Sequence, residues 1–158
     1  MPIDLMTARG QALLESGETP WQVYPRPQMK RDSYLNLNGY WDFAVSNQDG
    51  FPAEYNKTIR VPFCPESMLS GIEKHYPEGV NLFYRRKLTL PAGFNRGKVL
   101  LHIGAADQVA DVFVNGQQIC HHEGGYDAFS CDITAALEAE DTSNFLIVTS
   151  ESVRVSVP

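Results

Sequence analysis

The chain has 158 residues, of which 43% are hydrophobic, and its formal net charge is -6 at pH 7. This length suits one domain with one core, since domains usually hold about 100–200 residues, and it is too short for a (β/α)8 barrel of about 250 residues. The acidic balance also argues against nucleic acid, whose phosphate backbone favours a concentrated basic surface.

An N-terminal extension is predicted over residues 1–23, followed by the domain over residues 24–158. Within the extension, residues 6–16 are expected to form a short helix that ends at Gly17. No apolar run is long enough for a signal peptide or for a membrane helix of about 18 residues. We therefore expect a cytoplasmic chain that makes no contact with membranes.

Short strands separated by turn-forming residues fill the first half of the domain. The alternation across residues 35–43 predicts a strand with a bend or bulge at Gly39. Further strands are expected at residues 58–61 and 83–90. Trp41 has two interpretations, a platform that stacks on a sugar ring or a filler of the core. The second is favoured, because large aromatic side chains dominate core energetics.

Asn115-Gly116 is the strongest turn signal, because both residues tolerate the positive φ that a type I′ hairpin turn requires. A two-residue turn would place Val112 opposite Ile119 on the buried face and Cys120 on the other face. Upstream, residues 99–103 are apolar on both faces, which predicts a strand in the centre of its sheet.

The last predicted strands are residues 144–149 and 153–157. Seven or eight short strands with almost no helix are typical of an all-β sandwich. The loop at residues 63–82 is unusually long for a compact domain, which indicates that it either has a function or packs on itself.

The three cysteines give little evidence for a disulfide framework. Cys64, Cys120 and Cys131 form an odd set without C-x-x-C spacing, so neither a disulfide nor a zinc site is favoured. Free, partly buried thiols are the expected state.

His121-His122-Glu123 is the only segment that looks like a metal ligand set. Neighbouring residues on a strand point to opposite faces, so only His121 and Glu123 could converge. We expect no metal and no cofactor, because phosphate-binding glycine loops and nucleophile elbows are also missing from the sequence. Carboxylates are numerous, but no spacing specifies the close pair of a retaining glycosidase.

Several segments resemble the N-terminal sugar-binding domain of glycoside hydrolase family 2, in the same order and spacing. The matching residues are 37–43, 59–62, 84–86, 100–116, 122–129 and 132–134, and the most specific are N-G-Y-W-D-F and G-G-Y-x-x-F. That family includes β-galactosidases, β-glucuronidases and β-mannosidases. The resemblance implies a jelly-roll β-sandwich of the galactose-binding-domain type.

The resemblance also implies how such a domain works. In the family, an immunoglobulin-like domain and a (β/α)8 barrel follow, and the barrel carries both catalytic glutamates. No Asn-Glu-Pro motif is present here, so no catalytic residue is assigned. Loops of the sugar-binding domain reach toward the barrel, which makes Tyr76, Glu78, Asn81 and Glu151 the candidate sugar contacts. A surface loop without a ligand is the alternative for this segment.

Three functions are open on the sequence. The first is a non-catalytic accessory domain that helps to shape the β-glycoside pocket of a larger β-galactosidase or β-glucuronidase. The second is a free-standing carbohydrate-binding module, and the third is a structural domain that docks on a neighbouring domain. The fold alone does not decide between them.

Overall fold

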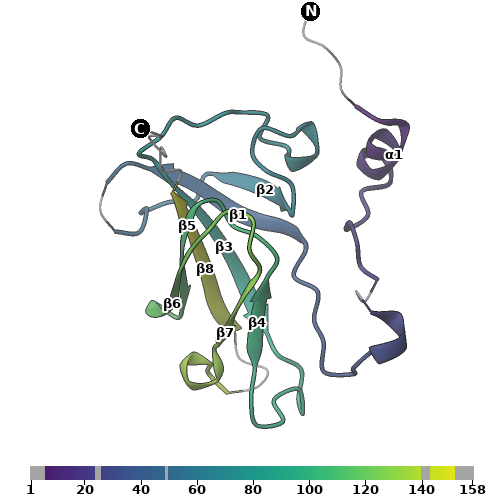
Figure 1. The fold of residues 1–158 in the computed structure, drawn as a ribbon, viewed down its shortest axis with the longest axis vertical. Coiled ribbons are helices and arrows are strands. Elements are labelled where there is room, and N and C mark those ends of the chain that lie inside the picture. The colour runs from purple at the N-terminus through teal and green to yellow at the C-terminus, as the bar shows by residue number, and fades with distance from the viewer. Residues whose placement is uncertain (1–5, 24–25, 49, 140–142, 152–158) are drawn as a thin grey trace, which may run out of the picture. The chain divides into compact units, whose positions relative to one another are not determined.

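A computed structural model describes residues 6–23, 26–48, 50–139 and 143–151. Two compact units are present (Figure 1), one made of residues 1–41 and 58–75 and the other of residues 42–57 and 76–158. In the described part of the chain, no helix is both long and apolar enough to cross a membrane.

The first unit contains the only α-helix of the described residues. Its elements are α1 (Ala8–Ser16), η1 (Pro27–Met29), the start of β1 (Gly39–Ser46), β2 (Lys57–Val61) and η2 (Met68–Ser70). The hydroxyl of Thr7 accepts a hydrogen bond from the amide of Gly10 at 3.1 Å, and Gly17 ends the helix with φ of 65°. The predicted helix and its end are therefore confirmed.

Arg60 holds the end of α1 in place. Its side chain is only 2% exposed. Nη1 and Nη2 donate to the carbonyl of Leu13 at 3.4 and 3.3 Å, and Nη2 also donates to the carbonyl of Glu18. A guanidinium at a helix C-terminus satisfies the last carbonyls and complements the helix dipole.

Trp41 belongs to the core. It is 7% exposed, and its indole Nε1 donates to the carbonyl of Leu37 at 2.7 Å. The preferred interpretation is confirmed, because a ring that is buried on both faces offers no platform to a sugar.

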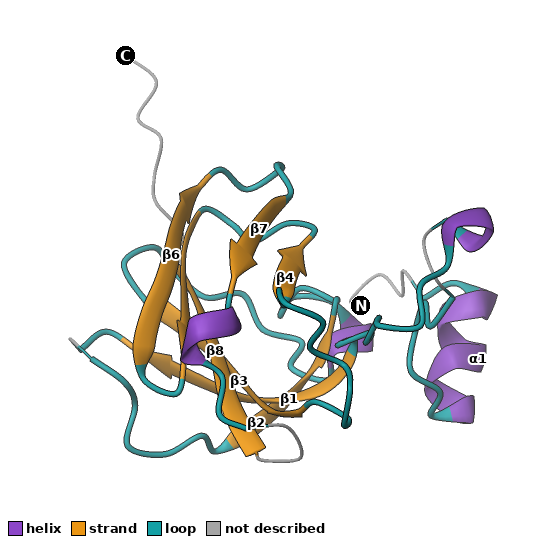
Figure 2. Ribbon diagram, turned by 90° about the horizontal axis from the view of Figure 1, so that it is seen from below, coloured by secondary structure: helices purple, strands orange, loops and turns teal. Residues whose placement is uncertain are grey.

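The second unit contains two β-layers (Figure 2). Its strands are β3 (Asn81–Thr89), β4 (Leu100–Ile103), β5 (Val109–Val114), β6 (Gln117–Glu123), β7 (Phe129–Asp132) and β8 (Ser143–Glu151), with η3 (Thr134–Ala136) before β8. The larger sheet has the order β2-β1-β3-β8-β5-β6, and β4 pairs with β7 in the smaller one. The expected all-β jelly-roll sandwich is confirmed; the strand predicted at residues 153–157 lies outside the described residues.

The core of this unit lies between the two layers. Phe43, Val112 and Leu146 have no exposed surface, and Leu101 and Ile133 from the smaller-sheet side are 7% and 1% exposed. The prediction that residues 99–103 form a central strand was wrong. β4 lies in a two-stranded sheet, where Leu100 is 49% exposed.

The β5–β6 hairpin forms at the predicted turn but with a different register. Asn115 and Gly116 have φ of 51° and 82°, as a type I′ turn requires. A bulge next to Val112 then shifts the pairing, so Val112 lies opposite Cys120 instead of Ile119. Because a one-residue shift reverses the faces of a strand, Cys120 moves to the buried face.

This shift explains a disulfide that the sequence did not predict. Cys120 on β6 is bonded to Cys131 on β7, so the bond joins the two sheets. The expectation of free, partly buried thiols was wrong for these two residues; Cys64 is free as expected, but it is exposed instead of partly buried.

Candidate functional site

Five strands of the larger sheet each have one end in the same row of paired residues, which runs across the sheet. Ser46 pairs with Asn81, Asn81 with Glu151, Glu151 with Val109, and Val109 with Glu123. Because loops leave a sheet where its strands end, the segments 47–48, 50–56, 76–80, 104–108 and 124–128 all lie at this end of the second unit. We call it the loop end.

Asn81 and Glu151, two of the predicted contacts, are direct neighbours at the loop end. Asn81 is the first residue of β3 and is half-buried, and Glu151 is the last residue of β8. Paired residues on antiparallel strands lie about 5 Å apart, which is close enough to act on one ligand. The side chain of Glu151 lies outside the described part of the structure.

Tyr76 and Glu78 differ in their exposure to solvent. Tyr76 is 9% exposed, its ring centroid lies 6.0 Å from that of Phe43, and its hydroxyl accepts a hydrogen bond from Nζ of Lys57 at 3.0 Å. Glu78 is exposed in the turn that precedes β3. Tyr76 therefore anchors the loop in the core, while Glu78 is accessible to solvent; the sugar contacts of both remain predictions.

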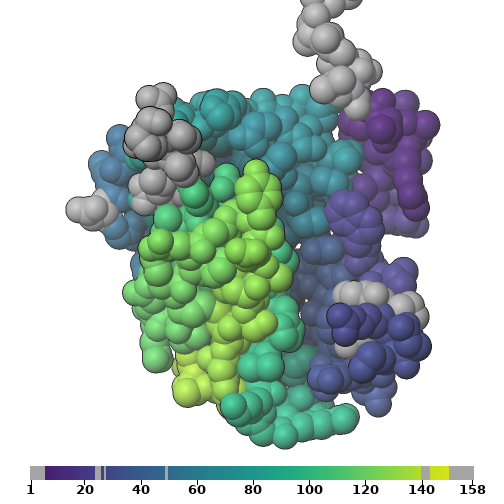
Figure 3. Space-filling view, in the orientation of Figure 1, coloured from purple at the N-terminus to yellow at the C-terminus, as the bar shows by residue number. Residues whose placement is uncertain are grey.

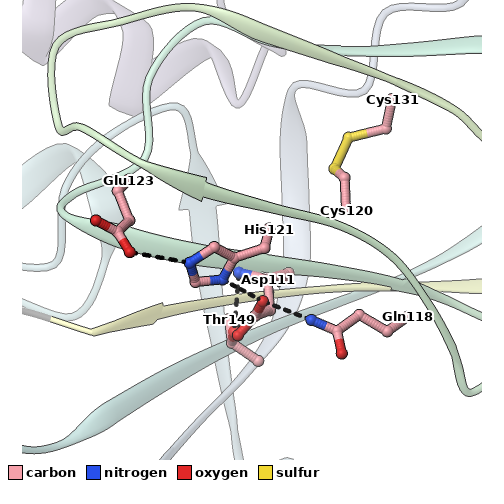
Figure 4. A network of polar contacts seen from close by, with 7 residues as sticks. All are labelled: Asp111, Gln118, Cys120, His121, Glu123, Cys131 and Thr149. Atoms are coloured by element: carbon pink, nitrogen blue, oxygen red, sulfur yellow. Dashed lines mark hydrogen bonds and ion pairs between the residues drawn. A yellow bond between two sulfur atoms is a disulfide. The ribbon is translucent and has the colours of Figure 1, made fainter.

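A polar network covers the outer face of β5, β6 and β8 (Figure 4). Nδ1 of His121 lies 2.8 Å from Oδ1 of Asp111, and its Nε2 lies 3.3 Å from Oε1 of Glu123. Gln118 donates to the same oxygen of Asp111 at 2.7 Å. The predicted convergence of His121 and Glu123 is confirmed, and the partner that the sequence pattern missed is Asp111 on the adjacent strand.

The two carboxylates raise the pKa of His121, first through the hydrogen bond with Asp111 and then through that with Glu123. The imidazolium donates from both nitrogens, so this contact stabilises the fold at pH values below the pKa of the unfolded chain. That contribution is lost as the pH rises through the folded pKa.

We expect the His121 ring to titrate above the ordinary histidine range in an NMR pH titration of its ring resonances. In the Asp111→Asn variant the midpoint should fall, because the larger of the two favourable contacts is removed. Equal midpoints in the wild type and in Asp111→Asn would contradict this assignment.

Tyr126, in the loop between β6 and β7, is the most prominent residue that the sequence interpretation left without a role. Its side chain is 100% exposed. The G-G-Y-x-x-F pattern marks the position, but it does not show which way the ring points. Among the described residues, no three His, Cys, Asp or Glu side chains are grouped to hold a metal ion.

Sequence comparison identifies relatives that are much longer than this chain. Residues 56–156 match the family model described as glycosyl hydrolase 2 galactose-binding domain-like. The β-glucuronidase of Felis catus is 29% identical over 133 residues, covering 74% of this chain and 20% of that protein. A β-galactosidase of Thermoanaerobacter pseudethanolicus is 31% identical, covering 78% of this chain and 17% of that protein.

Structural comparison identifies the same kind of relative as the sequence comparison. A β-glucuronidase of Faecalibacterium prausnitzii superposes with a TM-score of 0.60 at 28% identity, covering 82% of this chain and 22% of the other. The chain thus spans about a fifth of the relatives that it matches. It corresponds to their galactose-binding-like N-terminal domain, and it belongs to the glycosyl hydrolase 2 galactose-binding domain-like family.

Proposed function

We propose that this chain is the non-catalytic carbohydrate-recognition domain of a larger β-glycosidase, in which the loop end forms one wall of the substrate pocket. Immunoglobulin-like and barrel domains of the same enzyme would be its partners, and a β-galactoside or β-glucuronide its substrate. The observation that carries the proposal is the pairing of Asn81 with Glu151 at the end of the sheet where the loops gather.

Polar side chains at such a position suit a sugar. Hydroxyl groups of a pyranose both donate and accept hydrogen bonds, which an amide and a carboxylate can satisfy together. The catalytic acids would belong to the barrel. This division explains why the chain has numerous carboxylates without a pair that specifies hydrolysis.

The test compares this chain with the longer polypeptide that its gene encodes, using chromogenic β-galactosides and β-glucuronides. We expect hydrolysis only by the longer polypeptide. There, Asn81→Ala should lower kcat/KM by about tenfold, the cost of one lost polar contact. Lys87→Ala is the matched control, since Lys87 is exposed on the same strand about 20 Å away. Hydrolysis by the 158-residue chain alone, or a gene that encodes no further domain, would overturn the proposal.

A further inference from the structure

Tyr126 exposes a large aromatic ring entirely to solvent, at the tip of the 124–128 loop. The surrounding segment, light green in Figure 3, lies on the surface of the second unit. An isolated exposed aliphatic residue would need no explanation, but tyrosine rings are favoured at contact sites because they combine an apolar face with a polar hydroxyl.

The loop that carries Tyr126 is braced on both sides. The amide of Gly124 donates to the carbonyl of Gln108 at 2.7 Å, and the rings of His122 and Phe129 stack with centroids 4.1 Å apart. The disulfide between Cys120 and Cys131 closes the segment at its base. A ring that is presented by an ordered loop loses little conformational entropy when it binds.

Two carboxylates lie against the glycines that precede Tyr126. The carboxylate of Asp107 lies so close to Gly125 that a methyl group at that position would collide with it. Asp127 follows Tyr126 directly in the chain and is exposed. An aromatic face beside charged acceptors suits a pyranose, whose C–H face packs on the ring while its hydroxyls donate to the carboxylates.

The charge around the loop restricts the kind of sugar. Residues 99–153 include no lysine or arginine. Three acidic residues lie at the loop itself: Asp107 and Asp127, whose side chains approach Gly125 and Gly124, and Glu123, which directly precedes the loop. The carboxylate of a uronic acid would meet charges of its own sign at this loop, whereas a neutral sugar would not.

We propose that the 124–128 loop is a second carbohydrate contact, selective for neutral hexopyranosides over uronates, with Tyr126 as its stacking residue. The proposal rests on the proposed function only for the class of ligand. It is independent of the contact assigned to Asn81, which lies on β3 and is separated from β6 by the two strands β8 and β5.

The test is an NMR titration of the 158-residue chain, at low salt, with three separate probes: methyl β-D-galactopyranoside, methyl β-D-glucopyranoside and methyl β-D-glucuronide. We expect the neutral glycosides to shift the amides of residues 124–128 with a Kd of about 1–10 mM, typical of one stacked ring. The uronide should bind at least about fivefold more weakly. This difference in Kd should become smaller as salt is added, because salt screens the repulsion between carboxylates.

Three variants test whether the affinity depends on the aromatic ring of Tyr126. Tyr126→Ala should raise the Kd by about tenfold or more, while Tyr126→Phe, which keeps the ring, should change it by less than about threefold. Both should fold normally, because the side chain is wholly exposed. Tyr40→Ala, at a tyrosine that is 62% exposed in the first unit, is the matched control and should leave the titration unchanged.

Three results would overturn the proposal: an unshifted loop, equal affinity for the uronide, or full affinity in Tyr126→Ala. Each can occur while a longer enzyme that contacts its substrate with Asn81 still hydrolyses β-glycosides, so failure of this proposal is distinguishable from failure of the proposed function. Conversely, neutral glycosides that bind at Tyr126 would support this proposal even if the gene encodes no catalytic domain.

Discussion

Replacing Arg60 with alanine is expected to lower the free energy of unfolding by about 3 kcal/mol, measured by urea denaturation. The guanidinium is buried and donates to the carbonyls of Leu13 and Glu18. Hydrogen bonds from a charged group contribute about 1.5–3 kcal/mol each, and their removal leaves acceptors unsatisfied beside a new cavity.

Two further variants make the Arg60 result specific. Arg60→Met fills much of the space but donates no hydrogen bond, so it should still cost more than about 1 kcal/mol. Arg96→Ala removes an exposed arginine and should change stability by less than about 0.5 kcal/mol. If Arg60→Met were as stable as the wild type, the carbonyl contacts would contribute nothing to stability, contrary to this prediction.

Loss of the disulfide between Cys120 and Cys131 should have a similar effect, about 3 kcal/mol. The bond spans a sequence separation of 11 residues, and closing a loop of this size restricts the unfolded chain by about that amount. The measurement compares urea denaturation of the wild type and of the Cys120→Ala/Cys131→Ala variant, each with and without dithiothreitol. The reductant should destabilise the wild type alone.

Thiol titration provides the control for the disulfide. The denatured, unreduced chain should show one reactive thiol, that of Cys64, and the reduced chain three. Cys64→Ala should unfold at the wild-type urea concentration, because its side chain is exposed. Three thiols in the unreduced chain would contradict the pairing.

Features set by neighbouring residues could be predicted from the sequence. Asn115-Gly116 specifies its turn through backbone conformation alone, and Gly17 ends α1 for the same reason. The alternation that brought His121 and Glu123 together is equally local. Such patterns were sufficient for the fold class, because the number and spacing of the strands follow from them.

Features that depend on distant residues could not be predicted. The bulge beside Val112 is marked by no local pattern in the sequence, and the register that it produces places Cys120 on the same face as Val112, where it is bonded to Cys131. The side chain of Arg60 donates to the carbonyl of Leu13, which is 47 positions away in the sequence. No periodic pattern in the sequence indicates a contact over that distance. In the candidate site, the placement of Asp111 against His121 likewise required the strand pairing.

The disulfide has a consequence for the segment that it encloses. Residues 120–131 form a covalent macrocycle, so a single protease nick between the two cysteines would release no fragment. The same closure makes the segment a candidate for synthesis as a cyclic peptide or for grafting into another scaffold, with the Tyr126 tip carried as one unit.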